Sequence, residues 1–298
     1  MPAGILLGLL GDRPLATDSR ASATPVDLFV VGHNGVRLHL LDWGGPPAAP
    51  VCVMLHGVGG NAWSFGALAP LLHVPFRLVS VDQRGGGDSD KPVDGYSAED
   101  FALDVLAIHA ELGNALPMVL VGHSRGGWQA AYIAGRWPAL VSHLVLVDPA
   151  RITFDSASDA DAFYGPVRAA LGPFDSRAAA LSFAQARDPQ AVWNADREHT
   201  FFFGYSEQPD GSLLGKMPPR VLDKLREARS QDIHDLLGAI NVPTLLLVAT
   251  KSNQERQSQK LAYKDAISHA RVEFVEGTHH IHIEQPAHVA RLIHELLV

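Results

Sequence analysis

Apolar positions in this chain gather into short runs that alternate with glycine-rich turns and longer amphipathic stretches. Short continuous apolar runs between turn signals are typical of strands covered on both faces. The continuous run at 51–55 is therefore expected to form such a strand, and further apolar-rich stretches predict strands at 76–82, 118–121, 141–147, 242–249 and 272–275. Two earlier runs, at 27–31 and 36–42, flank the turn residues His33-Asn34-Gly35 and predict a hairpin at the edge of a sheet.

Stretches with helical periodicity separate these runs, at 62–72, 97–112, 127–137 and 286–297. Alternation of strands and helices predicts an α/β fold with a mostly parallel sheet and helices on both faces. Active sites of such folds lie outside the carboxyl ends of the strands. The glycine-rich turns after Leu55, Asp82 and Val121 are expected to meet there.

The alternation breaks between residues 150 and 235. This stretch holds helical pieces, turns and clustered aromatic residues at 201–205, but no good strand alternation. We interpret 150–235 as an inserted helical cap, with 26–149 and 236–298 as the core and 1–25 as an N-terminal extension.

Composition excludes several classes of protein. The chain has 298 residues, 47% hydrophobic content, 19% charged content and a net charge of −8, with no basic stripe for nucleic acid. Its one cysteine, Cys52, lies in an apolar run and is typical of a packed core thiol. No apolar run is long enough to cross a bilayer, and no Lys or Arg precedes the apolar N-terminal stretch as in a signal peptide. We expect a cytoplasmic protein with a small-molecule substrate and no membrane partner, and leave a homo-oligomer open.

The segment Gly122-His123-Ser124-Arg125-Gly126 fits the pattern G-x-S-x-G. It stands between a predicted strand and a predicted helix, which is the context of a nucleophile elbow. The sharp turn forces Ser124 into a strained conformation, and Gly122 and Gly126 let the strand and the helix approach each other. Ser124 is therefore the candidate nucleophile.

Three further motifs accompany this elbow. They are His56-Gly57 before a glycine-rich loop, the stretch 82–90, which fits D-x-R-G-x-G-x-S, and the stretch 277–286, which fits G-x-H-x-x-H-x-E-x-P. With them the chain resembles the α/β-hydrolase fold superfamily, in its serine esterase-like branch with an inserted helical cap, over 26–150 and 240–298. The resemblance implies a Ser-His-acid triad. It also suggests that Asp82 and Arg84 brace their loop.

The resemblance places the catalytic base on His279. His280 stands where the family often has an aromatic residue, and His282 is the family's second histidine, so we expect both to pack and hydrogen-bond locally. Three imidazoles so close also suggest a metal ion. Since no matching Cys, Asp or His cluster appears elsewhere, we expect neither a metal nor a cofactor.

The acid departs from the family pattern. It usually follows the strand at 242–249 by about four residues, where this chain reads Thr250-Lys251-Ser252-Asn253. We favour Asp148, because a strand end fixes its side chain near the site. Glu255 is the second choice, since its loop would have to bend inward. The structural alternative for Asp148 is a turn cap before Pro149.

An oxyanion hole requires two preorganised N–H donors. The backbone amides of Val58 and Arg125 are the candidates. The Arg125 side chain is interpreted either as a contact to an acidic substrate or as part of an outward-pointing surface pair.

Candidate substrate contacts flank these motifs: Gly57, Trp63, Trp128 and Phe202. Trp128 is more typical of packing, and the aromatic cluster around Phe202 is typical of a small core within the cap.

Three functions are the main candidates, with carbon–carbon bond hydrolysis and acyl transfer as further alternatives. The leading hypothesis is a serine hydrolase that acts on a small or medium carboxylic ester, lactone or related acyl compound through an acyl-enzyme. The second is a cofactor-free dioxygenase of the same fold, which it resembles through the sequence His123-Ser124-Arg125-Gly126-Gly127-Trp128 and an acid after the same strand as Asp148. The third is a catalytically weak ligand receptor, motivated by the missing acid at 249–253.

Overall fold

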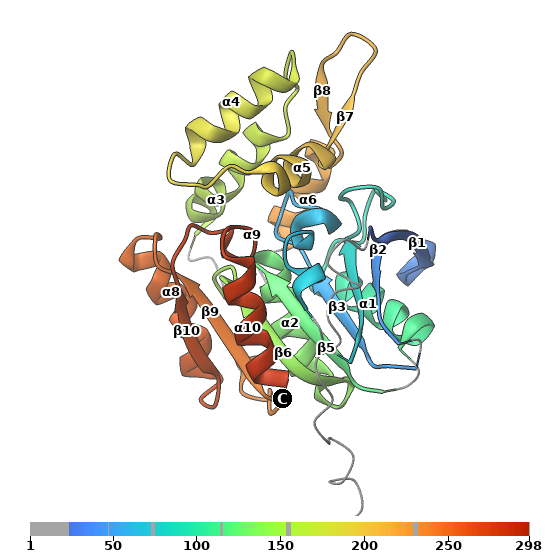
Figure 1. The fold of residues 1–298 in the computed structure, drawn as a ribbon, viewed down its shortest axis with the longest axis vertical. Helices are drawn as coiled ribbons and strands as arrows, with labels where there is room; N and C mark the ends of the chain where they lie inside the picture. Colours follow the sequence, from blue (N-terminus) through green and yellow to red (C-terminus); the bar gives the residue numbers. More distant parts are fainter. Residues whose placement is uncertain are drawn as a thin grey trace, which may run out of the picture.

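The computed structural model describes residues 24–46, 48–72, 75–113, 116–152, 156–228 and 232–297 (Figure 1). The expected extension at 1–25 falls almost entirely outside them. The described residues form an eight-stranded sheet in the order β1-β2-β4-β3-β5-β6-β9-β10. Strand β2 is antiparallel to β1 and β4, and the remaining neighbours are parallel, which confirms the mostly parallel sheet and the edge hairpin. The strands are β1 (Val26–Val31), β2 (Arg37–Gly44), β3 (Val51–Leu55), β4 (Arg77–Asp82), β5 (Met118–His123), β6 (Val141–Val147), β9 (Thr244–Ala249) and β10 (Arg271–Val275).

Helices cover both faces of this sheet, and β3 shows why its sequence is continuously apolar. Val53 and Leu55 belong to one core cluster and Cys52 and Met54 to the other, so successive side chains serve opposite faces. The first face is covered by α1 (Ala98–Leu112), α2 (Arg125–Arg136) and α8 (Gln254–Ala266). The second is covered by α10 (Pro286–Leu297) with the 3₁₀ turns η2 (Ala62–Phe65) and η3 (Ala69–Leu71).

Local sequence sets where these helices begin and end. Ser97 caps α1 by accepting from the amide of Asp100, whose carboxylate accepts from the amide of Ser97. The helix expected at 62–72 forms only two 3₁₀ turns, because Gly66 and Pro70 interrupt it.

Most of the segment between β6 and β9, residues 156–228, lies at one end of the molecule, apart from the sheet (Figure 1). We call residues 156–228 the cap segment. It comprises α3 (Ala157–Ala170), α4 (Arg177–Arg187), α5 (Ala195–Phe203), the hairpin β7 (Tyr205–Glu207) and β8 (Leu213–Gly215), and α6 (Pro219–Ala228). The hairpin was not expected, since strands of three residues are too short to show alternation. The short helix α7 (His234–Leu237) then leads back to the sheet.

The cap segment packs on loops that follow the carboxyl ends of the core strands. A cluster of α3 and α6 side chains includes Tyr96 and Phe101 of the core. The carbonyl of Thr200 accepts from Asn61 Nδ2 at 2.9 Å, and Lys216 pairs with Asp88 at 2.8 Å. The cap segment therefore lies over the edge where the sequence motifs converge.

Among the described residues, we find no helix with both the length and the apolar character that a membrane span requires.

Candidate active site

Ser124 occupies a strained turn between β5 and α2. Its backbone angles are φ 53° and ψ −118°, which a residue with a side chain rarely adopts. The turn depends on two glycines, since a Cβ on Gly122 would lie 2.2 Å from the carbonyl oxygen of Gly126. A Cβ on Gly126 would lie 2.0 Å from the carbonyl oxygen of Leu55. The glycine positions of the motif are therefore required by close backbone approach.

Backbone hydrogen bonds tie this turn to the end of β6. The amide of Ser124 donates to the carbonyl of Val147 at 3.1 Å, and its carbonyl accepts from the amide of Ala150 at 2.9 Å. Asp148 stands between these two partners, so the candidate nucleophile and the candidate acid share one rigid piece of backbone.

Asp148 and His279 form a short hydrogen bond. Oδ2 of Asp148 lies 2.5 Å from Nδ1 of His279. The carboxylate is fully buried, whereas the His279 side chain is 40% exposed. Burial raises the pKa of Asp148, but the hydrogen bond from His279 and the nearby charges of His279 and Lys260 outweigh it and hold the pKa below its ordinary value. The carboxylate therefore stays charged beside the imidazole.

Two further donors fix the Asp148 carboxylate. Oδ1 accepts from the amide of Ala249 at 2.9 Å, and Oδ2 accepts from Nζ of the buried Lys260 at 2.6 Å. The side chain thus bonds to β9, α8 and His279 rather than to the turn before Pro149. Glu255, the second-choice acid, lies exposed on α8 with its carboxylate accepting from Gln259, and it does not reach His279.

The other ring nitrogen of His279 makes no hydrogen bond to any described residue. Ser124 Oγ is likewise not hydrogen-bonded to His279 in this structure. His123, which directly precedes Ser124 in the chain, contacts His279. Nε2 of His123 lies 2.8 Å from the carbonyl oxygen of His279, and the two rings are 4.6 Å apart between centroids. Such contacts often tighten only when a substrate is bound.

The loop after β3 passes directly beside Ser124. A Cβ on Gly57 would lie 3.0 Å from Cβ of Ser124. Nδ1 of His56 donates to the carbonyl of Gly57 at 2.7 Å, and the amide of Gly60 donates to the same oxygen at 3.0 Å. In a trans peptide N–H and C=O point in opposite directions, so these bonds also fix the amide of Val58.

The tautomer of His56 follows from its second partner. The amide of Gln83 donates to Nε2 at 3.1 Å, which leaves the proton on Nδ1. Burial lowers the pKa of His56 and keeps the ring neutral. The sequence motif His56-Gly57 is thereby explained by the orientation of one peptide bond.

Two groups of described residues bring possible metal ligands within 4.8 Å of one another: His123, His280 and His282, and His39, Asp82 and Asp88. His39 and Asp82 already bond to each other at 2.7 Å. His282 is fully buried and packs on Phe65, with 5.3 Å between the ring centroids. Neither ring nitrogen of His282 has a hydrogen-bond partner among the described residues, so packing, but not hydrogen bonding, accounts for it.

The environment of this histidine cluster favours neutral rings. Burial lowers the pKa of His282 to about 3, and it holds the pKa values of His123 and His280 well below the ordinary value. A charged Arg197 in the cap segment adds to the effect on His280 and His282.

The predicted substrate contacts lie in different surroundings. Trp128 is in the core, and its Nε1 donates to the carbonyl of Ile152 at 2.9 Å. Trp63 lies where core and cap segment meet, with His199 at 4.3 Å between ring centroids. Phe202 lies in the cap segment under the guanidinium of Arg177, which is 3.8 Å from its ring.

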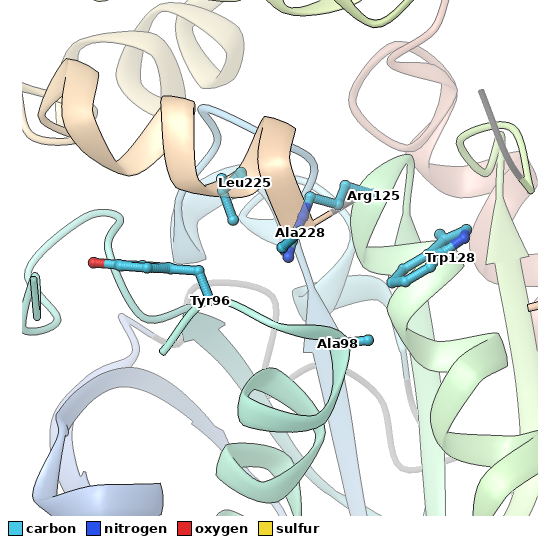
Figure 2. A pocket seen from close by; sticks show the side chains of 6 residues that line it. All are labelled: Tyr96, Ala98, Arg125, Trp128, Leu225 and Ala228. Carbon is cyan, nitrogen blue, oxygen red and sulfur yellow. The ribbon is translucent and has the colours of Figure 1, made fainter. Parts of the chain in front are cut away.

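Arg125 is 5% exposed and stacks on Phe101 at 3.9 Å, so the surface-pair interpretation is wrong. Burial follows because α6 of the cap segment covers this part of α2. Figure 2 shows Arg125 in a small pocket whose volume of about 10 Å³ holds at most one water molecule. Its lining residues are Tyr96, Ala98, Arg125, Trp128, Leu225 and Ala228.

Asp82 and Arg84 brace their loop as expected. Arg84 forms a bidentate salt bridge with Asp104, in which both hydrogen bonds are 2.6 Å long, and it donates to the carbonyl of Gly95. Asp82 accepts from the amides of Ala62 and Asp88. Both side chains are buried.

Lys260 is the residue of this site that sequence reasoning missed. A lysine within an amphipathic helix is ordinarily solvated, but Lys260 shares a helical face with Tyr263 and Ile267, at spacings of three and seven residues. Both of those residues are buried. The sequence signal that could have indicated a buried lysine is therefore its position on the apolar face of α8.

Comparison with known proteins identifies the fold. A sequence profile of the alpha/beta hydrolase fold family matches residues 50–286. The chain is 37% identical over 101 residues to 2-(acetamidomethylene)succinate hydrolase of Mesorhizobium japonicum, covering 34% of this chain and 36% of that protein. It is 38% identical over 112 residues to the bifunctional esterase/perhydrolase DCH of Acinetobacter calcoaceticus, covering 37% and 40%.

These two alignments span less than half of either relative. Among solved structures, that of E-2-(acetamidomethylene)succinate hydrolase aligns over 92% of this chain and 99% of its own, with a TM-score of 0.80 and 24% identity. At that identity the likeness shows the shared fold.

Proposed function

The chain belongs to the alpha/beta hydrolase fold family, and from this premise we propose that it is a serine hydrolase with Ser124, His279 and Asp148 as its triad. Its substrate is a small or medium carboxylic ester, lactone or related acyl compound. The observation that carries the proposal is the Asp148–His279 hydrogen bond of 2.5 Å on the same backbone unit that holds Ser124 in its strained turn.

In the first half of the reaction, Ser124 Oγ attacks the substrate carbonyl and Nε2 of His279 takes its proton. Asp148 accepts from Nδ1 of His279, which sets the tautomer and stabilises the imidazolium. The amides of Val58 and Arg125 donate to the oxyanion, and one such donor is typically worth about 3 kcal/mol.

Collapse of the tetrahedral intermediate breaks the bond to the leaving group, which takes the proton from His279. The resulting acyl-Ser124 is then hydrolysed. His279 removes a proton from the attacking water and returns it to Ser124 as the acid product leaves. The chemistry needs no redox change and no group beyond these side chains and amides.

The relatives' names support hydrolysis of acyl compounds, since one is a hydrolase and the other an esterase. The cap segment covers the site and, on this proposal, selects the acyl group. The third hypothesis, a weak ligand receptor, loses its motive because Asp148 supplies the carboxylate that the loop 250–253 lacks.

Hydrolysis of p-nitrophenyl acetate and butyrate tests the proposal. We expect turnover by the parent, turnover by the control variant Ser258→Ala, whose serine lies exposed on α8, and none above background by Ser124→Ala. A fluorophosphonate probe should label Ser124, as identified by peptide mass spectrometry.

Two outcomes would contradict the proposal. An unlabelled parent without turnover would remove the hydrolase assignment. Oxygen consumption with an aromatic hydroxyl substrate would instead favour the cofactor-free dioxygenase, in which His279 deprotonates the substrate and Ser124 only hydrogen-bonds to it.

A further inference from the structure

The helix α8 follows the loop in which this family usually carries its acid. Here the loop 250–253 has no carboxylate, and α8 directs a cation to the acid at the end of β6 instead. Lys260 Nζ lies 2.6 Å from Oδ2 of Asp148. The lysine side chain is 7% exposed and the carboxylate is fully buried, so the pair is shielded from water.

Lys260 and His279 bind the same oxygen of Asp148. His279 Nδ1 lies 2.5 Å from Oδ2 and Lys260 Nζ lies 2.6 Å from it, while Oδ1 is held by the amide of Ala249. Within the described part of the chain, Asp148 is the one hydrogen-bond partner of Lys260 Nζ. The lysine therefore serves the carboxylate and no other group there.

We propose that Lys260 is a positioning residue of the triad, which keeps the Asp148 carboxylate charged and aimed at Nδ1 of His279. The inference rests on the proposed function. A buried carboxylate is costly unless it is paired, and His279 is neutral for part of each catalytic cycle. Lys260 provides a permanent partner during that part of the cycle.

The charged and titratable groups that face Asp148 are few. Lys260 of α8 and His279 contact it directly, and His282 of α9 (Ile281–Glu284) interacts with it through space. His123, at the end of β5, lies behind His279. Without the lysine, no other cation among these groups compensates Asp148 when His279 is neutral.

Removal of the cation should therefore make the Asp148–His279 pair easier to protonate, because the two groups share one hydrogen bond and titrate together. An opposite charge in contact typically lowers a carboxyl pKa by at least about one unit. In Lys260→Gln, we expect the acid limb of the pH profile to move upward by about one pH unit. The rate should fall about tenfold at the acidic end and approach that of the parent at alkaline pH.

The readout is the rate at which the fluorophosphonate probe labels Ser124, measured across the pH range in which the protein stays folded. Lys260→Arg retains the charge and should restore the acid limb of the parent. Lys264→Gln is the matched control, because Lys264 lies one turn further along α8 and bonds to the carbonyls of Ser268 and Ala270. It should leave the profile unchanged.

A Lys260→Gln variant that is slower by the same factor at every pH, with an unmoved acid limb, would overturn the proposal. The same holds if the variant matches the parent throughout. A parent that is not labelled at Ser124 is a different result, since it contradicts the proposed function itself.

A second measurement decides the case in which Lys260→Gln does not fold. Lys260→Met and the double variant Asp148→Asn/Lys260→Met are then compared by circular dichroism. Folding restored in the double variant supports charge compensation of Asp148, because an ion pair removed whole leaves no buried charge. A double variant that also fails to fold assigns Lys260 to packing and overturns the proposal.

Discussion

The described residues include two histidine–aspartate pairs of similar geometry, each with a buried carboxylate. His39 Nδ1 lies 2.7 Å from Asp82, and His279 Nδ1 lies 2.5 Å from Asp148. Both carboxylates are fully buried and both accept backbone amides. A search for histidine–aspartate contacts alone would return both pairs as candidate catalytic dyads.

The two pairs differ at the second ring nitrogen. Nε2 of His39 is bonded to Asp27 at 2.9 Å, and the His39 side chain is only 2% exposed. Nε2 of His279 bonds to no described residue, and its side chain is 40% exposed. A histidine can act as a base only when one nitrogen remains available, so the first pair is structural and the second is suited to catalysis.

The protonation of His39 also fits a structural role. Burial lowers the pKa of His39, but the hydrogen bonds to Asp82 and Asp27 outweigh it and raise the pKa overall. His39 is thus stabilised as a cation between two carboxylates, where it joins β1, β2 and β4. Its proton is part of the fold and is not available for transfer.

Substitution of the two histidines should give the largest difference in activity between the two pairs. We expect His279→Gln to lower kcat/KM for p-nitrophenyl butyrate by about 10⁴-fold, because Ser124 loses its base. His39→Gln should retain the parent's kcat per folded molecule. Equal losses in the two variants would show that the second nitrogen does not distinguish the pairs.

Asp82→Asn should give the opposite result, with a large loss of stability and little loss of chemistry. Asp82 compensates His39 and holds the amides of Ala62 and Asp88, so we expect a loss of about 3–5 kcal/mol in the free energy of unfolding. Urea denaturation measures it, and kcat per folded molecule is the control. A stable variant without activity would assign Asp82 to the chemistry.

A third histidine, His282, is fully buried, and neither of its ring nitrogens has a hydrogen-bond partner among the described residues. The pKa of His282 is about 3 in the folded protein and about 6.5 in the unfolded chain. Between these two pH values, only the unfolded chain binds a proton at this imidazole. The free energy of unfolding is therefore unaffected by this group above about pH 6.5, and it decreases by about 1.4 kcal/mol for each pH unit below that value.

His282→Leu should therefore flatten the dependence of unfolding free energy on pH by about one proton, as measured by urea denaturation below about pH 6.5. An unchanged slope would mean that His282 is already protonated, or hydrated, in the folded state.

The smallest effect is expected at Glu255. Its carboxylate is exposed on α8, so Glu255→Gln should change the free energy of unfolding by less than about 0.5 kcal/mol and leave kcat/KM unchanged. The Asp148 assignment would be weakened by a large loss of kcat/KM in this variant.

Features that depend on nearby residues could be predicted from the sequence. Strand β6 spans the expected residues, which end in the buried apolar run 144–147. The turn at Ser124 follows from glycines that lie within two residues of it. A strand end constrains the side chain of Asp148, the proposed acid, and the structure brings it within hydrogen-bond distance of His279. These features need little knowledge of distant contacts.

Features that depend on docking between distant elements could not be predicted. The bond from Lys260 to Asp148 joins residues 112 positions apart and depends on how α8 rotates against the sheet. The burial of Arg125 depends on α6 of the cap segment, which has no counterpart among the motifs. The distinction between His39 and His279 likewise requires Asp27, which sequence reasoning did not connect to either.

We propose that the acid of the triad lies at the end of β6. The most direct test is kcat/KM for p-nitrophenyl butyrate in Asp148→Asn, with folding verified by circular dichroism. We expect a loss of about 10⁴-fold in a folded protein, because the amide no longer fixes the productive tautomer of His279. A folded Asp148→Asn variant that retains the activity of the parent would contradict this proposal.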